Sequence, residues 1–439
     1  MQVDKTTKND LSIFHNDEEQ SVFHHLNFAN TNGGRDYFRT VLSNPLDNLQ
    51  NINDTQHTIR VLMQVQEEWP TTAITNGTIM VIEKFYESPV DKYPKQPGLL
   101  SSFIYKIFHG PDYSITKYTV EHTIIFIKGM HSILDLLRRE EMSILLQGWH
   151  NRIEHYLNKP ILNEMVVVEN EKNLSATQIL QFGVYLRDHY KNSAFDLIDI
   201  FCKLDAYMSM AIACKKYRLV FPKLELSDKP FVQASGLFHL LLSAPVAYDT
   251  ALDIQHNFIF LTGANMGGKS TYIKAVGLSV YLAHIGMGVP ASSMHLSMFN
   301  GLLSNIQVED NIFKGESYFF NEVQRIKKTL VKISDGKNWL ILIDELFKGT
   351  NIQDAMKCST AVIEGLIKMK HSLFILSTHL YEIGEGLKQY PNIQFRYFET
   401  SMKDDILEFS YQIKEGISND RIGYLILKRE GVTKMLEEL

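Results

Sequence analysis

The first half of the chain shows the hydrophobic spacing of long amphipathic helices. Over residues 119–157, apolar residues recur at intervals of three and four and so share one helix face. These residues are Ile127, Met130, Leu134, Leu137 and Ile144. The same spacing returns over residues 175–218, where Ser175 is a suitable N-cap. Pro160 and residues 170–173 separate the two segments, so we expect an antiparallel helix pair with a short connection.

Residues 70–118 interrupt this pattern with a high density of helix breakers. The breakers are Pro70, Pro89, Pro94, Pro97, Gly98, Gly110 and Pro111. Proline removes a backbone donor and clashes with the preceding helical turn, which disfavours helices in such a segment. We therefore predict a loop-rich insert at about residues 70–118, within a helical domain that covers residues 1–225.

From about residue 226 the pattern changes to short apolar runs that alternate with amphipathic stretches. The runs cover residues 258–261, 340–343 and 373–376. This alternation predicts a parallel sheet with crossover helices. Two later runs, 394–398 and 407–413, are separated by charged residues and predict a hairpin. The second predicted domain is therefore an α/β domain over residues 226–439.

The composition fits a globular protein with a sizeable core and excludes several classes. Hydrophobic residues make up 45% of the chain, and 44 Lys and Arg against 50 Asp and Glu give a net charge of −6. That charge excludes a uniformly basic nucleic-acid coat but not a local basic patch. Three cysteines without a CxxC pair argue against a disulfide framework or a structural zinc site. We find no secretory signal and no apolar run of the roughly 20 residues that span a bilayer, so we expect a cytoplasmic protein without membrane association.

Residues 263–270 form a glycine-rich phosphate-binding motif. They fit the pattern G-x-x-x-x-G-K-[ST] and read Gly263-Ala264-Asn265-Met266-Gly267-Gly268-Lys269-Ser270. The apolar run before them and the amphipathic stretch after them supply the required strand and helix. Backbone amides and the helix N-terminus attract phosphate oxygens in such a loop. We expect Lys269 to reach the β- and γ-phosphates of a nucleotide and the Ser270 hydroxyl to coordinate Mg²⁺.

Two further apolar runs end in polar side chains that suit phosphate chemistry. Asp344 and Glu345 follow the run at 339–343. Asp344 can hold Mg²⁺ directly or through water, and Glu345 suits orienting and deprotonating an attacking water. His379 follows the run at 373–376 and can hydrogen-bond the γ-phosphate or that water. Solvated acids and a structural histidine are the simpler interpretations of each feature alone, but their combination with the glycine loop favours function.

The residues around these motifs are more specific than the motifs themselves. The stretch 262–272 has the distinctive centre Asn265-Met266-Gly267-Gly268 and continues to Ala283-His284-Ile285-Gly286 and Val289-Pro290-Ala291. The acidic pair opens the stretch Asp344-Glu345-Leu346-Phe347-Lys348-Gly349-Thr350, and the third motif reads Ser377-Thr378-His379. Together they resemble the nucleotide-binding motifs of the MutS family of DNA mismatch-repair ATPases. Weaker likeness to the start of the family's core domain covers residues 31–35, 42–46 and 52–62.

The resemblance implies a fold, ligands and a quaternary structure. It implies an α/β P-loop ATPase domain of the ABC type, preceded by an all-α core and lever domain. ATP and Mg²⁺ are the implied ligands, and Thr271 joins the residues of the glycine loop in the implied nucleotide-binding set. The stretch 315–319 lies where the family carries a serine that contacts the partner subunit's nucleotide. Ser317 is thus expected to act in trans, in a homodimer with a composite ATP site.

The sequence also departs from the family pattern. The chain begins at the core domain, so we expect the mismatch-reading and connector domains to be absent. Residues 160–174 leave room for only a short link instead of a clamp, and we expect no C-terminal helix-turn-helix. Ala264 stands where proline is usual, and Phe347 and Lys348 replace a glycine and an arginine. We therefore expect that the ATPase is kept and that direct mismatch reading is lost.

Two functions follow from these patterns. The first is a MutS-like ATPase that hydrolyses ATP to move helical arms in a DNA repair or DNA-structure transaction, without mismatch specificity of its own. The alternative is an ATP-gated protein-interaction module that does not bind DNA, which the acidic net charge favours. A Lys-rich stretch at residues 325–337 could contact phosphates, although a solvated helix face is the simpler interpretation.

Overall fold

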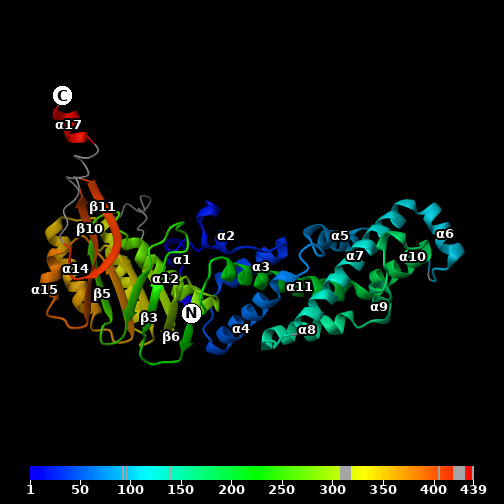
Figure 1. The fold of residues 1–439 in the computed structure, drawn as a ribbon, viewed down its shortest axis with the longest axis horizontal. Helices are drawn as coiled ribbons and strands as arrows, with labels where there is room; N and C mark the ends of the chain where they lie inside the picture. The colour runs from blue at the N-terminus through cyan, green and yellow to red at the C-terminus, as the bar shows by residue number, and fades with distance from the viewer. Residues whose placement is uncertain are drawn as a thin grey trace. The chain divides into compact units, whose positions relative to one another are not determined.

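A computed structural model describes residues 1–90, 93–94, 96–138, 140–306, 318–403, 406–418 and 431–437. The chain forms two compact units (Figure 1). The first, here called the sheet unit, consists of Met1–His25, Asn44–Ile52 and Tyr217–Leu439. The second, called the helical unit, consists of Leu26–Ser43 and Asn53–Lys216. Residues Met1–His25 therefore pack with the second half of the chain, whereas the domain boundaries predicted from the sequence placed them with the helices.

The helical unit is helical over both segments that the hydrophobic spacing predicts, but each segment holds two α-helices instead of one. Its α-helices are α3 (Asn32–Ser43), most of α4 (Leu49–Val65), α5 (Asn76–Glu87), α6 (Leu99–Phe108), α7 (Gly110–Leu137), α8 (Ile144–Leu157), α9 (Pro160–Val166), α10 (Ala176–Tyr185) and α11 (Lys191–Lys216). A π-helical segment, Leu186–Tyr190, joins α10 to α11. Ser175 caps α10 as predicted, because its hydroxyl accepts from the Gln178 backbone amide and its own backbone amide donates to the Gln178 side-chain oxygen.

The prediction of a loop-rich insert at residues 70–118 is wrong. Helices α5, α6 and the start of α7 occupy most of this segment. The prolines fall where helices tolerate them: Pro111 lies in the first turn of α7, and Pro89 follows the C-cap of α5 at Ser88. Proline in a first turn lacks only an amide that would have no helical partner. The breakers therefore mark where helices begin and end.

A buried carboxylate on α11 holds the start of α3 against that helix. Asp205 accepts hydrogen bonds from the backbone amides of Asn30 and Thr31, at 2.9 and 2.8 Å, and from the Thr31 hydroxyl at 2.6 Å. Gly34 lies so close to α11 that a Cβ atom on it would stand 2.1 Å from the Asp205 carboxylate. The glycine therefore permits the close packing of the two helices.

The sheet unit is built on a seven-stranded sheet with the order β1-β7-β8-β9-β5-β10-β11. The strands are β1 (Gln2–Val3), β5 (Phe258–Gly263), β7 (Gly301–Asn305), β8 (Trp339–Asp344), β9 (Ser372–Ser377), β10 (Ile393–Lys403) and β11 (Ile406–Glu415). Neighbouring strands pair in parallel, except that β11 is antiparallel to β10. The three predicted strands and the predicted hairpin are confirmed. A smaller sheet has the order β2-β6-β3-β4 and contains β2 (Lys223–Glu225), β3 (Val232–Leu237), β4 (Tyr248–Leu252) and β6 (Ser293–Ser297).

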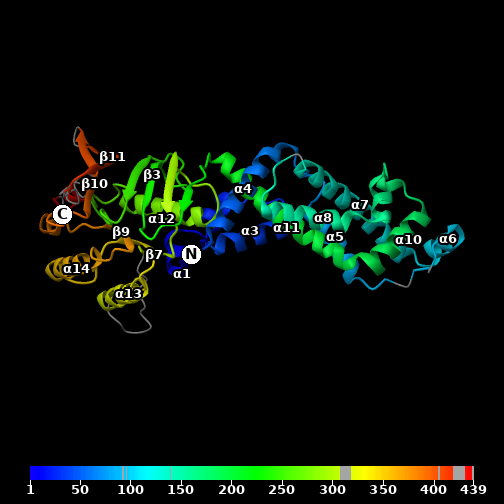
Figure 2. The ribbon, with the colours of Figure 1, turned by 90° about the horizontal axis from the view of Figure 1, so that it is seen from below.

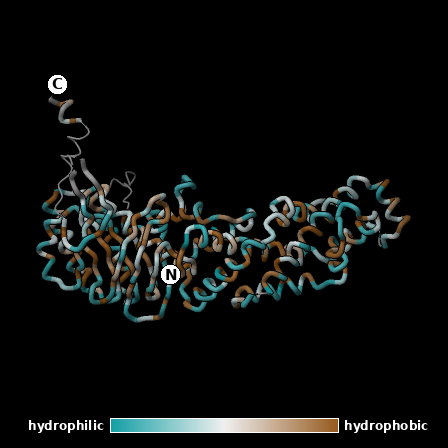
Figure 3. Tube along the Cα trace, in the orientation of Figure 1, coloured by the Kyte–Doolittle hydropathy of each residue, from teal (hydrophilic) through white to brown (hydrophobic). Residues whose placement is uncertain are grey.

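Helices cover both faces of the large sheet, as the buried strands require. Among the described residues, the α-helices of this unit are α1 (Lys5–Asp10), most of α2 (Val22–Leu26), α12 (Lys269–Ile285), α13 (Tyr318–Ile333), α14 (Ile352–Leu366), α15 (Glu382–Leu387) and α17 (Val432–Glu437). Helices α13, α14 and α15 share one core cluster with Ile341, Ile343 and Phe374, while α12 packs on the opposite face (Figure 2). Figure 3 shows hydrophobic residues along the strands between these layers. In the described part of the chain, no helix is both long and apolar enough to cross a bilayer.

Candidate active site

The glycine loop lies between β5 and the N-terminus of α12, where the sequence predicts it. Gly268 precedes the first helical residue and has a φ of 110°, and Gly263 at the end of β5 has a φ of 130°. A side chain at either position would be strained, and a Cβ on Gly263 would stand 3.0 Å from the Phe398 carbonyl oxygen of β10. The Tyr248 and Phe398 rings pack edge to face 5.7 Å apart beside the loop. The loop is thus held between β5 and α12 and lies against Phe398 of β10.

Lys269 is the buried cation of the loop. Only 6% of its surface is exposed, and its Nζ donates hydrogen bonds to the carbonyl oxygens of Gly263 at 2.7 Å and Ala264 at 2.9 Å. Burial lowers the pKa of this amine to about 8, against the raising effect of Asp344 and Glu345 nearby. An ammonium that is poorly solvated and next to a glycine loop suits the binding of phosphate oxygens.

Asp344 is the last residue of β8, and its carboxylate accepts hydrogen bonds from two hydroxyl groups of neighbouring elements. Ser270 Oγ at the start of α12 donates to Asp344 Oδ2 at 2.6 Å, and Ser377 Oγ at the end of β9 donates to Oδ1. Carboxylate and hydroxyl oxygens are the ligands that Mg²⁺ prefers in nucleotide sites. The donor set of Ser270 and Asp344 therefore fits a magnesium ion.

Glu345 is the next residue and stands between two basic side chains. His379 Nε2 lies 2.8 Å from one carboxylate oxygen, and Lys348 Nζ lies 2.9 Å from the other. Burial raises the pKa of this carboxyl, but the hydrogen bonds from His379 and Lys348 outweigh that effect and hold its pKa at about 2. Glu345 is therefore ionised at neutral pH. Its backbone has a φ of 62°, an uncommon conformation for a residue other than glycine, and its amide donates to the Ser377 carbonyl oxygen.

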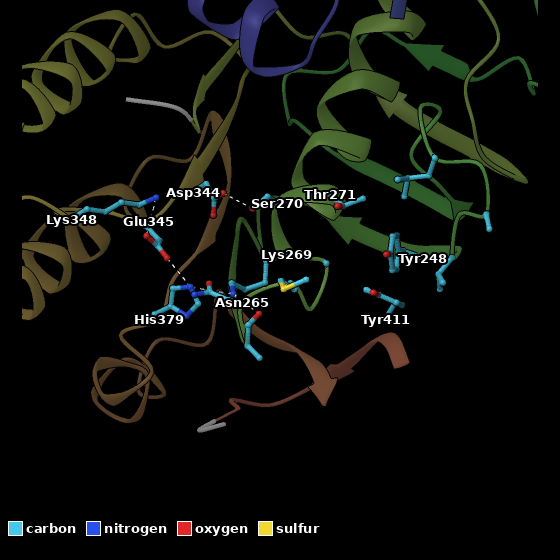
Figure 4. Close-up of a pocket in the computed structure, with 16 residues that line it drawn as sticks. Tyr248, Asn265, Lys269, Ser270, Thr271, Asp344, Glu345, Lys348, His379 and Tyr411 are labelled. Atoms are coloured by element: carbon cyan, nitrogen blue, oxygen red, sulfur yellow. Dashed lines mark hydrogen bonds and ion pairs between the residues drawn. The ribbon is translucent and has the colours of Figure 1, made fainter. Parts of the chain in front are cut away.

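These groups line one cavity of about 630 Å³ (Figure 4). Of the sequence-predicted residues, the lining includes Ala264, Asn265, Met266, Gly268, Lys269, Ser270, Thr271, Asp344, Glu345 and His379. Gly263 and Gly267 belong to the same loop but are not part of the lining. Ser317 lies outside the described residues. The structure thus brings the three predicted strand ends together, while the roles of the individual residues stay predictions.

The cavity also contains residues that sequence reasoning missed. Tyr248 from β4 and Tyr411 from β11 lie on the side of the loop opposite to Asp344, Glu345 and His379 (Figure 4). Leu242, Ala244 and Val246 add apolar side chains to the lining. None of these residues belongs to a recognisable motif, and they come from distant parts of the sequence. Lys348 was noted as a departure in the sequence, but its ion pair with Glu345 was not predicted.

A buried glutamate supports the loop that follows Glu345. Glu322 on α13 is 3% exposed, and its two carboxylate oxygens accept from the backbone amides of Lys348 at 3.1 Å and Gly349 at 3.2 Å. In the sequence this residue is an ordinary acid on an amphipathic helix, so only the fold reveals its position. The outward side of α13 carries exposed lysines, among them Lys327 and Lys328 of the Lys-rich stretch.

The strands of this parallel sheet end in a glycine loop, in an aspartate that suits Mg²⁺ and in a segment that carries a histidine. This arrangement defines the class of P-loop ATPase domains. Residues 259–436 match the family model of MutS domain V, the ATPase domain of that family. The second half of this chain is therefore similar to the ATPase domain of the MutS family.

Three relatives illustrate the extent of the likeness. The DNA mismatch repair protein MutS of Staphylococcus haemolyticus is 26% identical over 296 residues, which cover 64% of this chain and 33% of that protein. MutS protein homolog 4 of Homo sapiens is 30% identical over 236 residues, or 52% of this chain and 25% of that protein. The DNA mismatch repair protein msh3 of Aspergillus fumigatus is 28% identical over 285 residues, or 62% and 25%. The alignments therefore span a third or less of these relatives.

Proposed function

We propose that this chain is a Mg²⁺-dependent ATPase whose nucleotide state changes the conformation of its helices in a DNA transaction. One observation carries the proposal: Lys269, Ser270, Asp344, Glu345 and His379 come from three separate strand ends and line a single cavity. Positioning and charge stabilisation are the main requirements of phosphoryl transfer, and these side chains supply both.

Each group has a role that follows from its surroundings. The loop amides and Lys269 bind the phosphates, and Ser270 with Asp344 holds Mg²⁺, which neutralises phosphate charge when bound. Tyr248 and Tyr411, together with the apolar residues of the lining, are suited to pack against a nucleobase.

Glu345 and His379 act on the attacking water. A general base works best with a pKa near the operating pH, so a carboxylate with a pKa of about 2 is a weak proton acceptor. Glu345 therefore acts mainly by orienting the water through an accepted hydrogen bond. His379, which is bonded to Glu345, is placed to contact the γ-phosphate or the same water.

The wider assembly is part of the same proposal. We assign the helical unit to the family's all-α core and lever domain, and we assign Ser317 to the nucleotide site of a partner subunit in a homodimer. The names of the relatives, DNA mismatch repair proteins, support a DNA client. The net charge of −6 favours the second candidate, an ATP-gated module that binds a protein instead of DNA.

The first test is steady-state ATP hydrolysis with Mg²⁺ by wild type and by Glu345→Ala. We expect the variant to bind ATP but to hydrolyse it at least about 100-fold more slowly. A reduction of this size is usual when a group that orients or deprotonates the attacking water is lost. Glu364→Ala, at a half-buried position of α14 that does not line the cavity, is the control and should hydrolyse ATP normally. Equal turnover in wild type and Glu345→Ala would remove Glu345 from the mechanism.

DNA retention over a salt series separates the two candidates. Duplex and branched DNA should bind at low salt and dissociate steeply as salt rises, because phosphate contacts release counterions. If no DNA binds even at low salt while ATP is hydrolysed, the protein-interaction module is the correct alternative.

A further inference from the structure

Helix α6 of the helical unit carries an apolar face that faces solvent. Its sequence is Leu-Leu-Ser-Ser-Phe-Ile-Tyr-Lys-Ile-Phe, with one formal charge. The inward side chains are Ser102 and Tyr105, both buried, and Tyr105 packs in a small cluster with Tyr113, Ile179 and Leu180. Six outward side chains are between 46% and 85% exposed: Leu99, Leu100, Phe103, Ile104, Ile107 and Phe108. In the helical unit α6 lies at one end, beyond α7 and α10 (Figure 1).

This face is as large as the largest apolar patch that a monomeric protein typically carries. Each of the six side chains exposes roughly 100 Å² of apolar surface or somewhat less, so together they offer about 500 Å². The largest apolar patch on a monomeric protein is typically about 300–600 Å² and is often functional. Interfaces of standard size bury about 800 Å² per partner. Helix α6 therefore supplies most of the apolar core of one such interface.

The six residues follow a pattern that reads the same from both ends of the helix. They form two rows with a spacing of four, one of Leu99, Phe103 and Ile107 and one of Leu100, Ile104 and Phe108. Rows of this spacing are the ridges that interlock in the commonest class of helix packing. If two such helices cross antiparallel, Phe103 and Ile104 meet at the centre and residues 99 and 100 of each helix meet residues 107 and 108 of the other. A two-fold contact needs this kind of self-complementarity.

The charge of the face favours a protein partner over a lipid surface. Helices that lie on membranes combine an apolar face with a polar face rich in Lys and Arg. Lys106 is the single basic residue within α6, and it stands over the Tyr113 ring at 5.5 Å. Attraction to anionic lipid is therefore weak, whereas apolar burial against an identical face needs no charge.

We propose that α6 is a self-association surface that binds α6 of a second copy of this chain in an antiparallel, two-fold contact. The contact is independent of nucleotide, because it uses neither the cavity nor its charged residues. The proposed contact therefore goes beyond the proposed ATPase function, and the two proposals can be tested independently.

Sedimentation velocity of the full chain, without nucleotide and with a chelator, tests the proposal over a concentration series. Wild type should show a concentration-dependent dimer of the 50.5 kDa chain. Phe103→Glu should weaken this dimer by about 30-fold or more, which is the effect of losing a central anchor of an interface. Because Phe103 is 59% exposed, the variant should keep the wild-type fold, which circular dichroism and melting temperature check.

Met80→Glu is the matched control. Met80 is 56% exposed in the interior of α5, in the same unit, and Lys84 lies one turn later as a counter-charge. This variant should dimerise like wild type. A monomeric wild type at every concentration, or an equally strong dimer in Phe103→Glu, would overturn the proposal.

Oxidative cross-linking tests the geometry. Ile104→Cys, near the proposed two-fold axis, should form a covalent dimer on a non-reducing gel, while Ile104→Ser and Met80→Cys should not exceed the wild-type background of its three cysteines. Flotation with phosphatidylserine vesicles covers the lipid alternative. If wild type binds vesicles, Phe103→Glu does not, and no dimer forms in solution, α6 is a lipid-binding helix and the self-association is refuted.

Discussion

The cavity of the sheet unit and the outer face of α6 differ from ordinary protein surfaces in opposite ways: the cavity buries charge, and the face exposes apolar side chains. The cavity brings together an amine that is almost fully buried and two carboxylates, whereas α6 exposes six large apolar side chains. Buried charge and exposed apolar surface both reduce the stability of an isolated chain, so each indicates a site that a ligand or partner completes. The charged site needs a motif of fixed spacing, but the apolar face needs only a helix. For this reason the first is visible in the sequence and the second is visible only in the fold.

The two sides of α6 give the largest expected difference in stability. Tyr105→Ala should lower the free energy of unfolding by about 4 kcal/mol, because it removes a buried ring from the cluster beneath the helix. Phe103→Ala, two residues away on the outer side, should change it by less than about 0.5 kcal/mol in the monomer. Urea unfolding at low protein concentration measures both. Equal effects would show that the two sides of the helix are not distinct.

The buried amine of the cavity should control affinity more than stability. Lys269→Met should lower the affinity for ATP about 100-fold, since charge-assisted hydrogen bonds to the phosphates are lost. Isothermal titration calorimetry measures this affinity, and Lys274→Met on the same helix serves as the control. Unchanged ATP affinity in Lys269→Met would mean that the cavity does not bind phosphates through this residue.

Phe347 tests how the loop after Glu345 is stabilised. Its φ of 60° suits a glycine, yet its ring is 5% exposed and packs 5.6 Å from the ring of Phe319. Phe347→Gly relieves about 1 kcal/mol of backbone strain but loses the ring, so the net loss of stability should be about 2–3 kcal/mol. Phe347→Ala loses the ring and keeps the strain, so thermal unfolding should place it about 1 kcal/mol below Phe347→Gly. The reverse order would contradict the left-handed backbone.

The smallest expected effect concerns the ion pair between Lys348 and Glu345. Because the pKa of Glu345 lies below its ordinary 4.5, its ionised form stabilises the fold above that pH, and this contribution is lost as the pH falls towards about 2. Lys348→Met raises the pKa of Glu345, so the stability advantage of wild type should shrink over that pH range. Both side chains are partly exposed, which keeps the effect below about 1 kcal/mol. Chemical unfolding at several pH values measures it, with Lys357→Met as a control that should show no such trend.

Those parts of the site that a short stretch of sequence specifies could be predicted, and those that depend on the packing of distant segments could not. The glycine loop, Asp344 and His379 each follow an apolar run, and parallel strands bring such ends to one edge of a sheet, so their meeting could be predicted. Tyr248 and Tyr411 enter the cavity through strand order alone, and no local pattern marks them. Helices α5 and α6 are not predicted by the density of prolines, because a proline at a helix end, where the missing amide costs little, looks the same in the sequence as one that breaks a helix.

The carboxylate of Glu322 has a mechanical consequence for the site. Each of its two oxygens accepts a hydrogen bond from a backbone amide of the segment that carries Lys348, so the residue joins α13 to that segment at two points. A rotation or axial slip of α13 by one turn would pull both bonds beyond hydrogen-bonding range at once. We therefore expect α13 and this segment to move together. A displacement of α13 would then shift the backbone within a few residues of Glu345.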